Sequence, residues 1–207
     1  MKFFYTNFIK RFFDLLFSII ALIITCPFLL LSIFALMISN RSTKVLFFQL
    51  RPGFNEKIFK LVKIKTMNDK VDSDGKLLPD EERITKIGKF LRKSSIDELP
   101  QLWNVLKGDM SLIGPRPLLV EYLSYYTLEQ QRRHNVLPGI TGWAQIHGRN
   151  SLQFNERFVL DVWYVDNISI QLDLFIFYKT IIKIFKSENV LMQDPNKITD
   201  LNKNSIY

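Results

Sequence analysis

The sequence predicts an α+β protein that is mostly helical, with an apolar N-terminal segment that enters a membrane and a short β-hairpin among amphipathic helices. Three observations lead to this class. Residues 15–40 carry no charged side chain and are mostly apolar. Residues 57–67 mix β-branched, aromatic and lysine residues in partial alternation, which is typical of a strand. Residues 99–106 and 172–186 place bulky apolar residues at helical spacing.

The composition limits what the chain binds. Its 207 residues suit one compact domain with an anchor. Lys and Arg number 28 against 20 Asp and Glu, which favours an anionic partner such as a phosphorylated substrate, an anionic membrane or nucleic acid. Cys26 is the single cysteine, so an intrachain disulfide is excluded, and with only His134 and His147 beside it we expect no structural zinc site.

Residues 15–40 are expected to enter the membrane, because a span needs roughly 20 apolar residues. No small-residue cleavage site follows them, so we do not interpret them as a signal peptide. Pro27 lies near the centre and predicts a bend, since proline removes a helical hydrogen bond. Basic residues occur on both sides: Lys2, Lys10 and Arg11 before the segment, and Arg41, Lys44 and Arg51 after it. The pattern fits a re-entrant hairpin with both ends cytoplasmic or a kinked spanning helix, and these residues alone leave both open.

The segments that follow predict a β-hairpin, a loop and a helix. Pro52-Gly53 marks a turn before the strand-like residues 57–67. Residues 68–82 are acidic and contain Asp74-Gly75, so we interpret them as a solvated loop. Residues 85–93 predict a short basic helix.

A further helix is predicted from Asp97, its natural N-cap, to Gly108, which is placed to end it. Pro115 and Pro117 then impose an extended backbone. Residues 118–135 look helical and polar on one face.

Residues 172–186 predict a helix that is apolar over most of its surface, with lysines on the remainder. It fits either the membrane interface or a core position with a lysine-rich solvent face, and with an anchor present we favour the interface. The polar residues 196–207 are expected to be disordered. We therefore divide the chain into an anchor at residues 1–41, one domain at 42–190 and a polar tail at 191–207.

Asp97-Glu98 is an adjacent carboxylate pair at a predicted helix start. Free backbone amides and the helix dipole keep a carboxylate there ionised, and so available as a nucleophile or a metal ligand. Helix capping is the ordinary alternative role for these two residues, and the pair alone does not separate the two.

Arg116 lies between two prolines, which hold its five-donor guanidinium at low entropic cost. That arrangement suits phosphate recognition, and a surface arginine in a turn is the alternative. Lys63 and Lys65 lie two residues apart on one face of the predicted strand, where they would meet a diphosphate together or simply protect a strand edge. No GxxxxGK[ST] and no GxGxxG motif is present, so neither of those two nucleotide-binding motifs is indicated.

Three segments together resemble the small monotopic phosphoglycosyl transferases of the bacterial sugar transferase family. They are KIKTM, SSIDELPQLWNVLKGDMSLIGPRPLL and PGITGWAQIHGRN, in the family's order and spacing, within a match over about residues 7–190. RPGFNEKIFK, LLPD and GPRPLLVEYL further resemble the transferases that begin N-linked glycan assembly with diacetylated bacillosamine phosphate.

The resemblance implies a cytoplasmic catalytic domain and a ping-pong reaction. Asp97 would attack the phosphorus attached to the sugar of a UDP-sugar, forming a phosphosugar aspartate and releasing UMP. Glu98 would help to deprotonate the acceptor, undecaprenyl phosphate. Magnesium, bound partly by Asp97, would neutralise the diphosphate. The residues implied in phosphate binding are Arg116 with Pro115 and Pro117, and Lys63, Lys65, Arg92 and Arg149.

The family's anchor is a re-entrant helix-break-helix, which favours the hairpin here. The family commonly breaks this helix at Ser-Pro, whereas this chain has Cys26-Pro27, so we expect Thr25 to replace the serine's hydrogen bond to the backbone. Trp143 and His147 stand where Leu and Asn are more usual, a difference that would alter sugar preference.

The resemblance also implies the location and the partners. The protein would lie in the bacterial inner membrane with its domain on the cytoplasmic face, and would start N-glycan, O-antigen, capsule or exopolysaccharide synthesis. Partners would be a UDP-sugar, undecaprenyl phosphate, membrane lipids and downstream glycosyltransferases. An N-acetylated 6-deoxy-hexosamine such as diacetylbacillosamine is the first expectation for the sugar, ahead of galactose, glucose or another N-acetylhexosamine.

Two other classes compete with the enzyme. A non-catalytic membrane protein would bind anionic lipid through its basic surface, with the two carboxylates only capping a helix. A nucleic-acid binder would need exposed aromatic side chains, and Trp103 lies on an apolar helical face that we expect to be core. We therefore expect no nucleic-acid partner.

Overall fold

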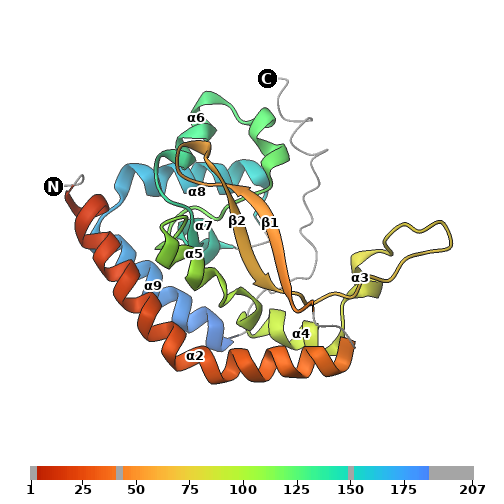
Figure 1. Ribbon diagram of the computed structural model, residues 1–207. Helices are drawn as coiled ribbons and strands as arrows, with labels where there is room; N and C mark the ends of the chain where they lie inside the picture. The colour runs from red at the N-terminus through yellow and green to blue at the C-terminus, as the bar shows by residue number, and fades with distance from the viewer. Residues whose placement is uncertain (1–3, 41–43, 149–151, 187–207) are drawn as a thin grey trace.

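The computed structural model describes residues 4–40, 44–148 and 152–186 (Figure 1). It is mostly helical with short strands, so the predicted class is confirmed at that level. The main elements are α2 (Lys10–Asn40), β1 (Leu46–Pro52), β2 (Ile58–Ile64), α3 (Asp80–Arg83), α4 (Lys86–Lys93), α5 (Gln101–Lys107), β3 (Ser111–Ile113), α6 (Leu128–Gln131), β4 (Gly139–Thr141), α7 (Trp143–His147), α8 (Phe154–Asn167) and α9 (Ile170–Lys186). Single turns of π- or 3₁₀-helix join them: η1 (Tyr5–Ile9), η2 (Phe54–Glu56), η3 (Ile96–Glu98), η4 (Val120–Tyr125) and η5 (Arg132–Asn135).

α2 is one continuous helix that contains Pro27 and is bent about midway along its length (Figure 1). Lys10–Ser39 is long and apolar enough to cross a membrane, judged by length and composition. Only 6% of its most apolar window is buried by the rest of the described chain, so most of this apolar surface stays uncovered, although Phe17 stacks on Phe177 of α9 and Leu36 packs against Leu91 of α4. The expected bend is present, and a helix of this shape fits both the hairpin and the kinked span.

The backbone at the bend has the hydrogen bond that we expected from Thr25. The Thr25 hydroxyl donates to the carbonyl oxygen of Ala21 at 2.6 Å. Cys26, in the position usually taken by serine, is exposed. Threonine thus bonds to the preceding turn in place of the missing serine.

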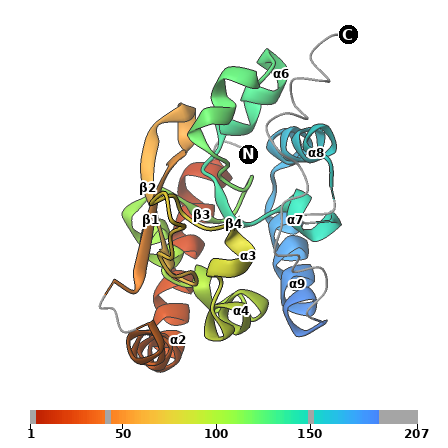
Figure 2. The same ribbon diagram turned by 90° about the vertical axis from the view of Figure 1, so that its right-hand side faces the viewer.

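β1 and β2 form the predicted hairpin, antiparallel from Leu46 opposite Ile64 to Pro52 opposite Ile58. Its inner face buries Phe59 and Leu61 against α5 and the residues just after it. The fully buried Asn104 of α5 fixes this contact, donating to Lys60 O at 2.8 Å and accepting from Val62 N at 3.1 Å. Figure 2 shows the hairpin on the opposite side of the molecule from α8 and α9.

Three local expectations were wrong. Residues 118–135 form two 3₁₀ turns and the one-turn helix α6 instead of one helix. α5 begins at Gln101 after Pro100, so Asp97 lies in the 3₁₀ turn η3 and is not the helix N-cap. Trp103 is 57% exposed, because α5 turns Leu102 and Val105 into the core instead.

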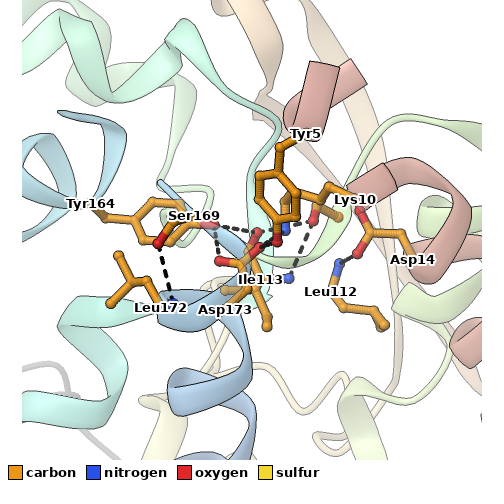
Figure 3. A network of polar contacts seen from close by, with 10 residues as sticks. Tyr5, Lys10, Asp14, Leu112, Ile113, Tyr164, Ser169, Leu172 and Asp173 are labelled. Carbon is orange, nitrogen blue, oxygen red and sulfur yellow. Dashed lines mark hydrogen bonds and ion pairs between the residues drawn. The ribbon is translucent and has the colours of Figure 1, made fainter. Parts of the chain in front are cut away.

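A buried polar network attaches the start of α2 to the rest of the domain (Figure 3). The Asp173 carboxylate of α9 accepts hydrogen bonds at 2.7 Å from Lys10 Nζ, the Tyr5 hydroxyl and the Tyr164 hydroxyl. Asp14 of α2 accepts from the backbone N–H of Leu112 in β3 at 3.0 Å. β3 leads directly to Gly114 and Pro115, so this network also places the segment that carries Arg116.

Candidate active site

Asp97 and Glu98 lie in η3, between α4 and α5. Ser95 begins this turn with φ 58°, a left-handed conformation that is uncommon for serine and that reverses the chain after α4. Asp97 is 8% exposed, and its side chain caps no helix. The ordinary capping role therefore does not account for this carboxylate.

Glu98 joins three segments that are far apart in the sequence. Its Oε1 lies 2.7 Å from Lys63 Nζ of β2 and 2.5 Å from Arg116 Nη2, and its Oε2 lies 3.3 Å from Arg116 Nη1. Burial alone would raise the pKa of Glu98, but the charges of Arg116 and Lys63 outweigh it and hold that pKa well below its ordinary range. Glu98 is thus an ionised carboxylate that holds both cations in place.

The pKa of the neighbouring Asp97 is shifted in the opposite direction. Burial and the charge of Glu98 raise the pKa of Asp97 to about 6, although Lys63, Arg92 and Arg116 act against the rise. Two adjacent carboxylates with pKa values driven apart are typical of a catalytic centre. Asp97 is the more basic of the two and forms no ion pair with any residue that the structure describes, so of the two carboxylates it is the one suited to act as a nucleophile.

The backbone around Arg116 is held rigidly. Gly114 lies so close to β4 that an added Cβ would stand 2.4 Å from Leu137 O, and a Cβ on Gly139 would stand 2.1 Å from Gly114 N. Pro115 and Pro117 are both buried. Arg133 Nη2 donates to the carbonyl oxygen of Arg116 at 2.7 Å. The two prolines therefore act through the backbone, and Arg116 presents its guanidinium to Glu98.

Arg133 is itself fixed by a fully buried ion pair with Asp161 of α8. Its Nη2 lies 2.7 Å and its Nε 3.1 Å from Asp161 Oδ2. The guanidinium lies over the rings of Tyr126 and Phe158, 5.8 and 5.7 Å from their centroids. Neither residue was identified from the sequence, since an arginine and an aspartate 28 positions apart show no local pattern.

Of the other residues implied by the resemblance, the structure places some near Asp97 and Glu98 and others away from them. Arg92 acts electrostatically on Asp97, and its Nε donates to Thr66 Oγ1 at 2.9 Å. Lys65 lies one residue past the end of β2 and pairs with Asp69, so it does not share the Glu98 cluster with Lys63. Arg149 and the tail at 191–207 lie outside the described residues.

No group of three or more His, Cys, Asp or Glu side chains that could hold a metal occurs in residues 4–40, 44–148 and 152–186. Both oxygens of Glu98 already face cations, which leaves Asp97 as the available carboxylate. Magnesium is commonly held by one or two carboxylates together with substrate phosphates, so the residues present fit a metal that arrives with its substrate.

Arg51 is a further basic residue near the site, although the sequence indicated it only as one of the basic residues that follow the apolar segment. It lies on the inner face of β1, and its Nη1 is 3.4 Å from Pro117 O. Thr66, which holds Arg92, was also missed as a separate site residue. The alternation of inward and outward side chains along β1 was the signal available for Arg51. The threonine in the KIKTM segment was the signal available for Thr66.

Comparison with known proteins gives matches over most of the chain. The bacterial sugar transferase profile matches residues 5–187. The chain is 53% identical over 191 residues to EpsL, an uncharacterized sugar transferase of Bacillus subtilis, covering 92% of this chain and 93% of that one.

Two longer relatives carry more specific names. They are an undecaprenyl-phosphate glucose phosphotransferase of Komagataeibacter xylinus, 42% identical, and an undecaprenyl-phosphate galactose phosphotransferase of Salmonella typhimurium, 36% identical. The matches cover 87% and 84% of this chain but only 36% and 40% of those proteins. The resemblance to this family is confirmed, and the chain belongs to the bacterial sugar transferase family.

Proposed function

We propose that this protein moves a sugar-1-phosphate from a UDP-sugar to undecaprenyl phosphate and releases UMP. The observation that carries the proposal is Asp97, a buried carboxylate of raised pKa that forms no ion pair within the described residues and lies under the charges of Lys63, Arg92 and Arg116. Relatives named as undecaprenyl-phosphate sugar phosphotransferases support the same reaction.

The reaction has two balanced displacements. In the first, an Asp97 oxygen attacks the phosphorus attached to the sugar, the bond from that phosphorus to the bridging oxygen breaks, and UMP leaves with that oxygen. In the second, an oxygen of undecaprenyl phosphate attacks the same phosphorus, the bond from that phosphorus to the Asp97 oxygen breaks, and the products are the undecaprenyl diphosphate sugar and the free Asp97 carboxylate. Lys63, Arg92 and Arg116 stabilise charge on the transferred phosphoryl group.

Glu98 and magnesium have supporting parts in this proposal. Magnesium, when bound by Asp97 and the diphosphate, neutralises negative charge on the phosphates. Glu98 keeps Lys63 and Arg116 in place in the structure described here. The role of Glu98 in deprotonating the acceptor stays a prediction. It requires the acceptor phosphate to draw Lys63 and Arg116 away from Glu98, because the pKa of Glu98 would then rise.

The sugar and the pathway are the finer part of the proposal. Relatives are named for glucose, galactose and N-acetylgalactosamine, so the family profile alone does not select a sugar. We keep an N-acetylated 6-deoxy-hexosamine such as diacetylbacillosamine as the first donor to test. The test is UMP release by the detergent-solubilised protein with undecaprenyl phosphate and a panel of UDP-sugars, with and without EDTA. No release from any donor would reject the proposed function.

We expect UMP release to depend on the ionisation of Asp97. An acid is charged above its pKa, so kcat/KM is expected to fall about tenfold per pH unit below about pH 6 and to level off above it. Glu98 raises the pKa of Asp97, so Glu98→Gln should move this midpoint to lower pH as well as lower the rate. A profile that stays flat from pH 5 to 8 would contradict the assignment of Asp97.

The proposed location is the cytoplasmic face of the bacterial inner membrane, with α2 as a re-entrant hairpin and α9 at the interface. The bend in α2 and its uncovered apolar surface support the anchor. On α9, Leu174, Phe175 and Tyr178 are exposed, as an interfacial helix requires.

Single cysteines at each terminus, introduced on a Cys26→Ser background, should both react from the cytoplasm. The physical reason is that a re-entrant hairpin returns both ends of the anchor to one side. Labelling is measured with a membrane-impermeant maleimide in intact cells and again after permeabilisation. Periplasmic labelling of either end would exclude the hairpin.

A further inference from the structure

Arg51 is a partly buried cation that forms no ion pair with a carboxylate within the described residues, although the charge of Glu98 acts on it from a distance. Its Nη2 donates to the Gln49 side chain at 2.6 Å, its Nη1 lies 3.4 Å from Pro117 O, and its Nε is buried with no hydrogen-bond partner. Opposite it in the hairpin register stands the buried Phe59, so β1 turns this guanidinium inward.

Several other buried or partly buried cations in the described part of the chain pair with a carboxylate. Lys10 has Asp173, Arg133 has Asp161, and Lys63 and Arg116 share Glu98. An unpaired charge removed from water costs folding free energy, and the cost is greater beside a charge of the same sign. Burial and then the charge of Arg116 lower the pKa of Arg51 to about 10, so it remains charged at neutral pH.

The cluster therefore holds more positive than negative charge. The four cations Arg51, Lys63, Arg92 and Arg116 interact with only two carboxylates, those of Asp97 and Glu98. A phosphate or diphosphate supplies the missing negative charge, and two guanidinium groups offer it paired N–H donors.

We propose that Arg51 binds a phosphate group of the substrate together with Arg116. The inference rests on the proposed function for the identity of the substrate, but the binding of phosphate is testable without turnover. The charges of Lys63, Arg92 and Arg116 act on Asp97, whereas Arg51 reaches Pro117 and stands beside Arg116. We therefore assign Arg51 to a phosphate next to the one under attack, with Arg116 within reach of both. That phosphate belongs either to the nucleotide or to the polyprenyl acceptor.

The experiment compares Arg51→Gln with Arg132→Gln in the full-length protein in detergent. Arg132 is a surface residue paired with Glu129 and Asp166, so its loss makes the same change in net charge away from the cluster. We expect Arg51→Gln to weaken binding of UMP and inorganic pyrophosphate by about 10- to 100-fold, and Arg132→Gln to leave it unchanged. Binding is measured by calorimetry and by the ligand-induced rise in Tm.

The Tm of Arg51 variants distinguishes a phosphate-binding role of Arg51 from a purely structural one. Arg51→Gln removes an unpaired cation, so the Tm without ligand should stay the same or rise. Arg51→Lys keeps the charge but loses the paired donors, and we expect a smaller loss of affinity in a protein that folds as the wild type does. A lowered Tm in both variants, without a selective loss of phosphate binding, would overturn the proposal.

The two phosphate sources give different kinetic results. Weaker UMP inhibition and a higher KM for the UDP-sugar would assign the nucleotide phosphate, and a higher KM for undecaprenyl phosphate alone would assign the acceptor. Unchanged values for all three, with unchanged pyrophosphate binding, would reject Arg51. If the wild type releases no UMP from any donor but binds pyrophosphate through Arg51, the proposed function fails and the Arg51 assignment stands.

Discussion

Asp97→Asn is expected to lower UMP release by at least about 10³-fold, because an amide cannot displace the phosphate leaving group. The variant should still fold and bind membranes. The pKa of Asp97 is raised in the folded protein, so its ionised form opposes folding at neutral pH, and the neutral amide should leave Tm at pH 7 unchanged or higher. Turnover is measured in the donor panel and Tm by thermal unfolding.

The matched control is Asp166→Asn, an exposed aspartate of α8 that pairs with Arg132 at the surface. It should keep full turnover. Incubation with donor and no acceptor should add the mass of a phosphosugar to the peptide that contains Asp97, and the Asp97→Asn variant should lack this adduct. Full turnover in Asp97→Asn would remove the nucleophile from the proposal and would favour direct transfer between the substrates.

Asp161→Asn is expected to lower the free energy of unfolding by about 3–5 kcal/mol, because it leaves the fully buried Arg133 without its counter-charge. For a chain of this size, a loss of that order corresponds to a Tm lower by about 6–20 °C. Asp166→Asn, on the same helix but exposed, should change Tm little. A Tm within about 2 °C of the wild type would mean that the ion pair contributes little to the fold.

A double variant separates stability from positioning. Arg133→Met with Asp161→Leu replaces the ion pair by apolar side chains and should recover most of the lost stability. It cannot restore the hydrogen bond to the Arg116 carbonyl oxygen, so turnover should stay low. Wild-type turnover in the double variant would show that this bond does not place Arg116.

The elements that depend on short-range patterns were predictable from the sequence. Apolar composition identified the long N-terminal helix α2, and Pro27 predicted its bend, because both follow from local properties of the chain. The β-hairpin and the helices α4, α5 and α9 follow from alternation and periodicity. Asp97, Glu98 and Arg116 were identified by the spacing of the signature segments, and Glu98 and Arg116 do meet.

The tertiary structure decided which charges meet, because an ion pair between distant segments leaves no local pattern. In the structure Lys63 pairs with Glu98, whereas Lys65, one residue past the end of β2, pairs with Asp69. The structure showed Asp97 free of the capping role, since Pro100 delays the helix to Gln101. Arg51, one flank of the anchor in the sequence, lies inside the site only because β1 folds back on β2 and turns it toward Arg116.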